Sequence, residues 1–285
     1  MTATRSLAAA LLAVAACAAA AQPQETAPPR KAFRVCQDPS NLPFSDTQGQ
    51  GYENKIAELF ARDLGLSLEY YSFPNRLAFI RNTLRYKLPG EDYRCDIVIG
   101  VPAGFDQVSA TKPYYRSTYV LVFPRGAGLD GVKNSNDLLA LPAKQLKALR
   151  IGIYDRSPAS AWLAKHDLVD QGVQYRMLNA DPAQYPGEII ERDLAGGKID
   201  AAIVWGPIGG YFAKRVRSPQ LQVVPMAGEP GIKFDYAMAM GVRYGEPQWK
   251  QQIEALLDKR RSEIEAILRD YGVPLLEDAA PAPAR

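Results

Sequence analysis

Short apolar runs alternate along the chain with stretches in which apolar residues recur at helical spacing. The runs 33–36, 68–73 and 96–99 have the length and composition of strands, and helical patterns lie between them. The first of these helices is expected to end at Gly65. A strand–helix–strand–helix–strand order predicts a parallel sheet covered by helices, which is the α/β class.

The alternation is interrupted by an extended run at 119–123, which no helical pattern precedes, and it resumes from residue 149. The second series contains strand-like runs at 149–154, 173–178, 199–205 and 221–224. A second extended run, 234–242, then leads into one long amphipathic helix predicted over 246–271. Two α/β units joined by two extended segments predict two lobes with a hinged cleft between them.

These elements divide the folded part of the chain into two predicted lobes. The first lobe takes residues 33–118 together with 243–276, and the second lobe takes 124–233. The segments 119–123 and 234–242 are the predicted hinge crossovers. Because open parallel sheets bind ligands at the carboxyl ends of their strands, the functional site is expected in the cleft.

The two ends of the chain differ in composition from the part that is expected to fold. Residues 1–21 combine the positive charge of Arg5, an apolar stretch and a run of small residues, which predicts a secretory signal peptide. The segment 22–32 contains prolines and few apolar side chains, which indicates a linker. Residues 277–285 are predicted to form a flexible tail.

A second processing signal overlaps the first. The sequence that ends at Cys17 resembles a bacterial lipoprotein cleavage box, in which this cysteine becomes the lipidated first residue. An ordinary cleavage site lies just downstream, so both a free and a lipid-anchored mature chain remain open. With either signal the mature chain is expected to leave the cytoplasm for the periplasm.

Two cysteines, Cys36 and Cys95, remain once the signal peptide is removed. An isolated pair in an oxidising compartment is a disulfide candidate. Two buried thiols are the alternative, since both residues adjoin apolar runs. We favour the disulfide.

Composition excludes several classes of function. The chain is 47% hydrophobic, which is enough to build a sizeable core. Its net charge is only +3, without a long Lys/Arg run, so nucleic-acid and membrane-surface binding are not expected. The chain has one histidine, His166, and no metal-binding motif accompanies it, so neither a metal nor a cofactor is predicted.

Several motifs, in their order along the chain, resemble the second structural class of periplasmic binding proteins, the type that binds polar amino acids. They occur at residues 42–44, 51–53, 95–100 and 112–115. The resemblance implies a two-lobed type II periplasmic binding protein fold with two hinge strands. In that class an arginine binds the ligand carboxylate and an aspartate binds its ammonium group. Here these positions hold Gly104 and Trp205, so an ordinary amino-acid ligand would bury unpaired charges and is not expected.

A narrower resemblance rests on the segments 36–44, 51–55, 79–84 and 101–106. These resemble the binding-protein-like J component of bacterial methanol oxidation. The resemblance implies a periplasmic accessory protein that binds or helps mature a pyrroloquinoline-quinone methanol dehydrogenase, of the calcium or the lanthanide branch, with its cytochrome c as a further partner. It does not imply that this chain carries the quinone. A solute-binding component of an ABC transporter, for a ligand that is not an ordinary amino acid, is the alternative.

The residues expected at the cleft are mostly aromatic. The candidates are Asp38, Phe44, Tyr52, Phe105, Asp106, Tyr154 and Trp205. Aromatic side chains there indicate a surface for stacking or for insertion of a partner. Phe44, Phe105 and Trp205 are expected to be exposed because each follows a strand end, whereas Tyr52 and Tyr114 are expected to pack into a lobe.

The acidic candidates near the cleft are Asp38, Glu53 and Asp106. They could act as acid and base or bind a hard cation. Because no spacing singles them out, solvated or capping carboxylates are the favoured interpretation. No catalytic residue is therefore predicted, and the chain is not expected to be an enzyme.

Overall fold

The structure of the protein is a computed structural model that describes residues 30–75, 78–176 and 185–277. Apart from Arg30, the described residues all belong to one compact unit, Lys31–Arg285. The predicted signal peptide, most of the predicted linker and nearly all of the predicted tail lie outside the described residues. Within the described part of the chain, no helix has both the length and the apolar character needed to cross a membrane.

The first group of elements confirms the predicted β-α-β-α-β order. In chain order they are β1 (Ala32–Gln37), β2 (Ser40–Asn41), β3 (Ser45–Asp46), α1 (Tyr52–Leu64), β4 (Ser67–Ser72), α2 (Phe79–Asn82), β5 (Val98–Pro102) and β6 (Ser109–Ala110). Strands β1 and β4 pair in parallel, with Val35 opposite Tyr70. Val35 also forms a parallel bridge to Ile97, just before β5, which brings the third predicted strand beside the first.

The second group of elements forms another α/β layer. In chain order they are β7 (Tyr115–Pro124), α3 (Ser135–Leu139), α4 (Ala143–Leu146), β8 (Ile151–Tyr154), α5 (Pro158–Lys165), a 3₁₀ turn (Val169–Gln171), β9 (Gly172–Tyr175), a π-helix (Ile189–Leu194), β10 (Ala201–Trp205), α6 (Gly206–Arg215), β11 (Leu221–Pro225) and β12 (Asp235–Val242). Strands β8 and β9 pair in parallel, as do β8 and β10.

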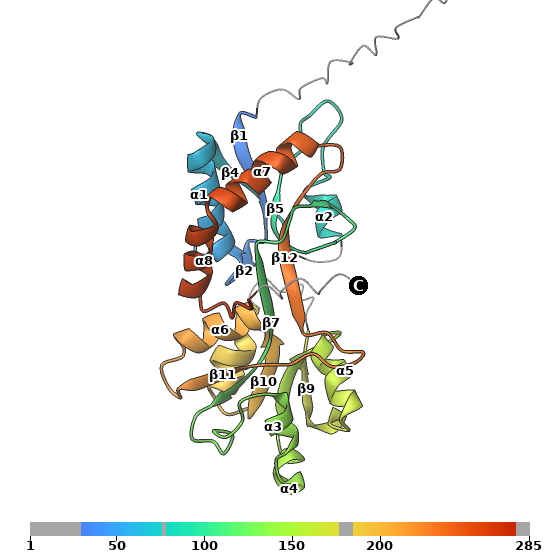
Figure 1. Cartoon of the computed structure of the whole chain (residues 1–285), viewed down its shortest axis with the longest axis vertical. Coiled ribbons are helices and arrows are strands. Elements are labelled where there is room, and N and C mark those ends of the chain that lie inside the picture. Colours follow the sequence, from blue (N-terminus) through green and yellow to red (C-terminus); the bar gives the residue numbers. More distant parts are fainter. Residues whose placement is uncertain (1–29, 76–77, 177–184, 278–285) are drawn as a thin grey trace, which may run out of the picture. The chain divides into compact units, whose positions relative to one another are not determined.

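Two long strands, β7 and β12, connect the two groups. They pair antiparallel in a sheet of order β5-β12-β7-β10-β8-β9. On their outer edges β12 pairs with β5 and β7 pairs with β10. Figure 1 shows both strands running from the elements around α1 to the elements around α6. The segment 119–123, predicted as a crossover, lies within β7, which begins four residues earlier, and the predicted segment 234–242 coincides with β12 except for its first residue.

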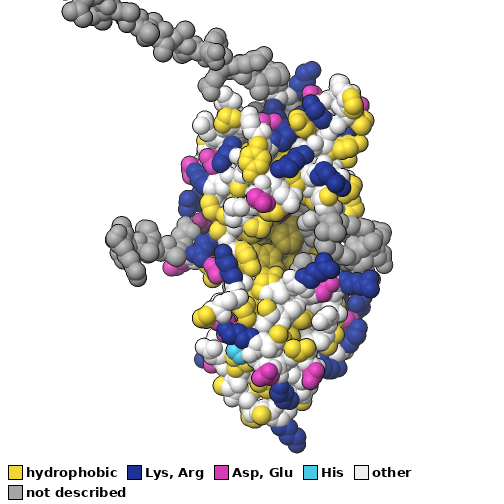
Figure 2. Space-filling view, turned by 90° about the vertical axis from the view of Figure 1, so that its right-hand side faces the viewer, with side chains coloured by type: hydrophobic (Ala, Val, Ile, Leu, Met, Phe, Trp, Pro, Cys, Tyr) yellow, Lys and Arg dark blue, Asp and Glu magenta, His cyan; other side chains and the backbone are white. Residues whose placement is uncertain are grey.

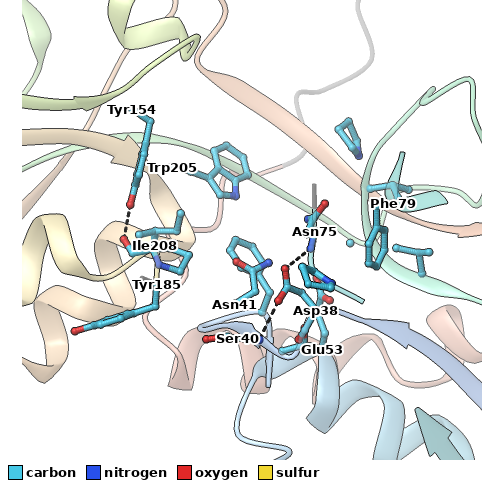
Figure 3. A pocket seen from close by; sticks show the side chains of 18 of the residues that line it. Asp38, Ser40, Asn41, Glu53, Asn75, Phe79, Tyr154, Tyr185, Trp205 and Ile208 are labelled. Carbon is cyan, nitrogen blue, oxygen red and sulfur yellow. Dashed lines mark hydrogen bonds between the residues drawn. The ribbon is translucent and has the colours of Figure 1, made fainter. Parts of the chain in front are cut away.

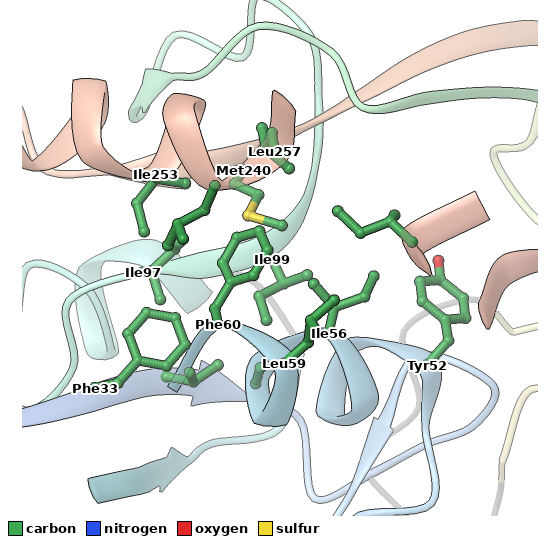
Figure 4. Close-up of a cluster of buried hydrophobic side chains, with 14 of the residues drawn as sticks. Phe33, Tyr52, Ile56, Leu59, Phe60, Ile97, Ile99, Met240, Ile253 and Leu257 are labelled. Atoms are coloured by element: carbon green, nitrogen blue, oxygen red, sulfur yellow. The ribbon is translucent and has the colours of Figure 1, made fainter. Parts of the chain in front are cut away.

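Separate hydrophobic clusters support the two groups. One cluster packs α1 against β1 and the C-terminal helices through Phe33, Ile56, Phe60 and Ile253, all of which are fully buried (Figure 4). In the second group, clusters form on both faces of the β7–β10–β8 sheet, around Trp162 on one face and Phe212 on the other. Each group therefore has its own core, as two lobes require.

The prediction of one long helix over 246–271 is wrong. Two helices, α7 (Pro247–Lys259) and α8 (Arg261–Asp270), meet at Arg260. At this break the Arg260 guanidinium donates hydrogen bonds to both oxygens of Asp63 on α1, at 2.7 and 2.6 Å. The pair holds the pKa of Asp63 well below its ordinary value. Apolar periodicity continues through both helices, so it gave no sign of the break.

The predicted disulfide between Cys36 and Cys95 is confirmed. The two Cα atoms are 5.3 Å apart, and the bond joins β1 to the segment before β5 across 59 positions of sequence. Both residues are buried in a cluster with Ile80 and Leu84. The bond therefore fixes the strand whose end leads to Asp38.

Replacing both cysteines with alanine is expected to lower the free energy of unfolding by about 2–4 kcal/mol, because the unfolded chain regains the freedom of a long loop. Urea unfolding of the oxidised protein and of the double variant measures this difference. Adding a reductant should lower the stability of the native protein and leave the double variant unchanged. Equal stability of the two proteins under oxidising conditions would contradict the prediction.

Candidate functional site

A cavity of about 730 Å³ lies between residues of the two groups of elements. Its walls come from the segments that follow β1 and β5 on one side and from the ends of β8, β9 and β10 on the other. Figure 2 shows this hollow with hydrophobic side chains across its floor. The volume lies within the range of about 300–1,000 Å³ that is typical of small-molecule sites.

Three phenylalanines form much of the wall on the side of β1 and β5. Phe44 lies between β2 and β3 and contacts Tyr52, with ring centroids 5.5 Å apart. Phe79 begins α2, and Phe105 lies in the loop that follows β5. All three line the cavity, so this wall presents aromatic rings from three separate segments.

On the opposite wall, three tyrosine hydroxyl groups are bonded to the protein itself. The Tyr154 hydroxyl donates to the Pro186 carbonyl oxygen at 2.5 Å. The hydroxyls of Tyr175 and Tyr185 donate to Asp193 at 2.5 Å and Glu191 at 2.8 Å. These hydrogen bonds occupy the polar ends of three lining tyrosines, so the cavity wall they form is mainly aromatic.

Trp205 ends β10 and faces the cavity beside Tyr154 (Figure 3). Its indole packs against Tyr119 and Tyr236 of the two long strands, with centroid distances of 5.5 and 5.7 Å. Contact with both β7 and β12 holds the ring where the two walls meet.

Two carboxyl groups lie at the other end of the cavity, as Figure 3 shows. Asp38 is fixed by the backbone N–H of Ser40 at 2.9 Å and that of Asn75 at 2.5 Å. Glu53, on the first turn of α1, is directed toward Gly100 of β5. A Cβ atom at Gly100 would lie 2.2 Å from Glu53 Oε1, so glycine leaves the space that this carboxyl group occupies.

Burial raises the pKa of Glu53 to about 8, with a further contribution from the nearby charge of Asp38. Within the described residues the Glu53 carboxyl group has no hydrogen-bond donor or ion-pair partner. A carboxylate in that position is costly unless a cation approaches it.

Five of the seven candidate cleft residues line the cavity: Asp38, Phe44, Phe105, Tyr154 and Trp205. The other two do not. Tyr52 is fully buried beneath Phe44, and its hydroxyl lies 2.8 Å from that of Tyr115. Asp106 is exposed beyond the lining, because the loop after β5 directs Phe105 inward in its place.

Sequence reasoning missed several lining residues. Tyr175 ends β9, but the strand predicted over 173–178 placed this residue in mid-strand, so the strand-end argument that selected Trp205 did not find it. Tyr119 belongs to the predicted crossover 119–123 and was not expected at the site, but its side chain also lines the cavity. Tyr185 and Phe79 lie outside strand ends, and no pattern in the sequence indicated them.

Gly104 and Trp205, at the positions of the two charged residues of the amino-acid-binding class, provide no charged group for a ligand. Gly104 is exposed and has a φ of 79°, in the left-handed region that favours glycine. Among the described lining residues the basic side chain is Arg176, which is exposed, and the acidic ones are Asp38, Glu53 and Glu188. The cavity wall is therefore acidic and aromatic.

No group of three or more potential metal ligands occurs among the residues that the structure describes. His166 follows α5, where its Nε2 is 2.8 Å from Glu229 and its ring packs at a tilt against Trp162, with centroids 4.8 Å apart. The cavity lining does not include it.

Comparison with known proteins identifies the family. No family model matches the chain. It is 30% identical over an alignment of 299 positions to the protein MoxJ of Methylorubrum extorquens, covering 95% of this chain and 93% of the relative. The chain belongs to the MoxJ family. The prediction of a relationship to the J component is thereby confirmed.

Solved structures agree with membership of the MoxJ family. The periplasmic binding protein XoxJ from Methylobacterium extorquens AM1 is 38% identical, with a TM-score of 0.69, over 86% of this chain and all of the other. MxaJ from Methlophaga aminisulfidivorans MPT is 24% identical with a TM-score of 0.71, also over 86% of this chain and all of that chain. These similarities confirm the predicted type II periplasmic binding protein fold.

Proposed function

We propose that this chain is a periplasmic accessory protein of methanol oxidation that binds a quinoprotein methanol dehydrogenase or assists its maturation. The observation that carries the proposal is membership of the MoxJ family in a chain whose charged amino-acid clamp is replaced by Gly104 and Trp205. The fold of a solute receptor is kept, while the groups that would hold an amino acid are absent from those two positions.

Export supports the same proposal. The first 21 residues have the pattern of a secretory signal peptide, and the similar protein XoxJ is described as a periplasmic binding protein. The disulfide between Cys36 and Cys95 suits an oxidising compartment. Lipid anchoring at Cys17 remains the alternative to a freely diffusing mature chain.

The cavity offers a means of contacting the dehydrogenase. Aromatic side chains that are half-buried in a concave surface act as binding hot spots, because each one removes a large area from water. Trp205, Phe105 and Phe44 have this environment and come from three different segments. We place the contact on these rings and assign no catalytic role to the chain.

Isothermal titration calorimetry of the mature chain with purified methanol dehydrogenase tests the proposal. A saturable complex is expected for the native protein. Absence of a complex, together with an unchanged dehydrogenase activity, would overturn the proposal. Adding the partner cytochrome c in a second titration tests whether it shares the complex.

Trp205→Ala is expected to weaken dehydrogenase binding by roughly 30-fold, the loss typical of a central aromatic residue. Trp205→Phe retains a ring and should restore most of the affinity, which separates loss of a contact from loss of fold. Tyr244→Ala serves as the control, because Tyr244 is 60% exposed and does not line the cavity. If Tyr244→Ala and Trp205→Ala lose the same affinity, the dehydrogenase does not bind specifically at the cavity.

A solute-binding component of an ABC transporter is the second candidate. The cavity volume of about 730 Å³ favours it, since a surface used only for protein contact needs no enclosed space. Tight binding of a small molecule by a chain that neither binds the dehydrogenase nor changes its activity would support this candidate over the first.

A further inference from the structure

The charges around the cavity select one class of small molecule. Three carboxyl groups and one exposed guanidinium line it within the described residues. Glu188 pairs with Arg192 at 3.0 Å, and Asp38 receives two backbone N–H donors. Glu53 has no such partner in the described part of the chain. An anionic guest would face these carboxyl groups with little compensation, whereas a cation would supply the charge that Glu53 lacks.

The aromatic walls match the rest of such a guest. Ring faces attract a cation within about 6 Å of their centroids and also cover an apolar body. The hydroxyls of Tyr154, Tyr175 and Tyr185 already donate to other groups of the protein, so these residues offer a guest their rings rather than free donors. Phe44, Phe105 and Trp205 add faces from three other segments.

We propose that the cavity binds a small organic cation that carries no carboxylate group. Glu53 and Asp38 receive its charged nitrogen, and the aromatic rings between the two walls cover its apolar part. Gly104 explains why the guest lacks a carboxylate, since it stands where the amino-acid-binding class has the arginine that binds such a group. This inference goes beyond the proposed role toward the dehydrogenase and does not depend on it.

Binding of such a guest is expected to depend on pH in a defined direction. The Glu53 carboxyl group, whose pKa is raised to about 8, must lose its proton to pair with a cation, so affinity should rise as the pH rises toward 8. Besides Asp38, the titratable groups that interact with Glu53 among the described residues are Tyr52, Tyr70, Tyr114 and Tyr115. The pKa of each tyrosine is raised above its ordinary value, so all four stay neutral over this range.

Calorimetry with three probes of one shape tests the inference. Benzylammonium, benzyl alcohol and benzoate present the same ring with a positive, a neutral and a negative group. At pH 8 the native protein should bind benzylammonium at least tenfold more tightly than the alcohol and should not bind benzoate. Between pH 6 and pH 8 the affinity for benzylammonium should rise roughly 50-fold, following the ionised fraction of Glu53, while that for the alcohol stays constant.

Variants then assign the charge selectivity to Glu53. Glu53→Gln should lose most of the preference for benzylammonium over benzyl alcohol, with Asp38 retaining the rest, and should lose the rise in affinity between pH 6 and pH 8. Glu69→Gln, at an exposed position on β4, should behave as the native protein does. Equal binding of both probes by the native protein, preference for benzoate, or no binding of benzylammonium at millimolar concentration would each overturn the inference. Dehydrogenase titration of the same proteins is a separate readout, so failure here leaves the proposed function to its own test.

Discussion

Replacing Glu53 with glutamine is expected to stabilise the ligand-free protein at pH 8 and to change its stability much less at pH 5. In the folded chain the pKa of Glu53 is raised from 4.5 to about 8, mainly by burial. The folded state therefore holds a proton that the unfolded state releases, and stability falls as the pH rises from about 5 to about 8. The loss amounts to at most about 1.4 kcal/mol for each pH unit. Glutamine does not titrate and avoids it.

Urea unfolding at several pH values between 5 and 8 measures this effect as the difference between the native protein and Glu53→Gln. Other titrating groups contribute equally to both proteins and cancel. Glu69→Gln is the matched control, because its side chain is exposed, and its stability should follow that of the native protein. Parallel curves for the native protein and Glu53→Gln would show that Glu53 is charged at neutral pH in the folded state.

Asp96→Asn is expected to lower the free energy of unfolding by about 3 kcal/mol, because it removes a buried carboxylate and leaves the buried Arg243 paired, within the described residues, only with the partly exposed Glu246, 2.8 Å away. Asp96 is fully buried. It accepts a hydrogen bond from Arg243 at 2.7 Å and two from Arg34 at 2.9 and 3.3 Å. Arg243 is itself 7% exposed and also donates to the carbonyl oxygens of Leu84 and Cys95. The network joins β1, the segment before β5 and the end of β12.

Asp92→Asn is the control for this substitution, since Asp92 is exposed in the loop that precedes Cys95. It should change stability by less than about 0.5 kcal/mol. Chemical unfolding at pH 7 compares the three proteins. A cost for Asp96→Asn no greater than that for Asp92→Asn would contradict the account of the buried network.

The fold could be predicted from the sequence because it depends on the spacing of apolar residues along many positions, which no single residue alters. The apolar runs of β8 and β10 have no polar interruptions and that of β1 has one, Arg34, so both the strand positions and their parallel order followed directly. The break at Arg260 was missed because it depends on a contact with Asp63, almost 200 positions away. Local patterns carry no information on such a pair.

The site was only partly predictable for the same reason. Trp205 and Tyr154 could be placed because each ends a strand, and strand ends meet at one edge of a sheet. Tyr52 could not be separated from Phe44 by position, since only the packing of α1 decides which ring faces outward. The carboxyl group of Glu53 became distinctive only when the structure showed its neighbours, Gly100 and Asp38.

The most direct test of the central claim is the specific activity of methanol dehydrogenase produced with and without this chain. Cells that produce the dehydrogenase together with the native chain should yield enzyme of normal activity. Cells lacking the chain should yield dehydrogenase of reduced specific activity. Producing the Trp205→Phe variant in those cells should restore the activity, whereas producing Trp205→Ala should restore little of it. Dehydrogenase of equal amount and activity from cells with and without the chain would contradict the proposal that it serves this enzyme.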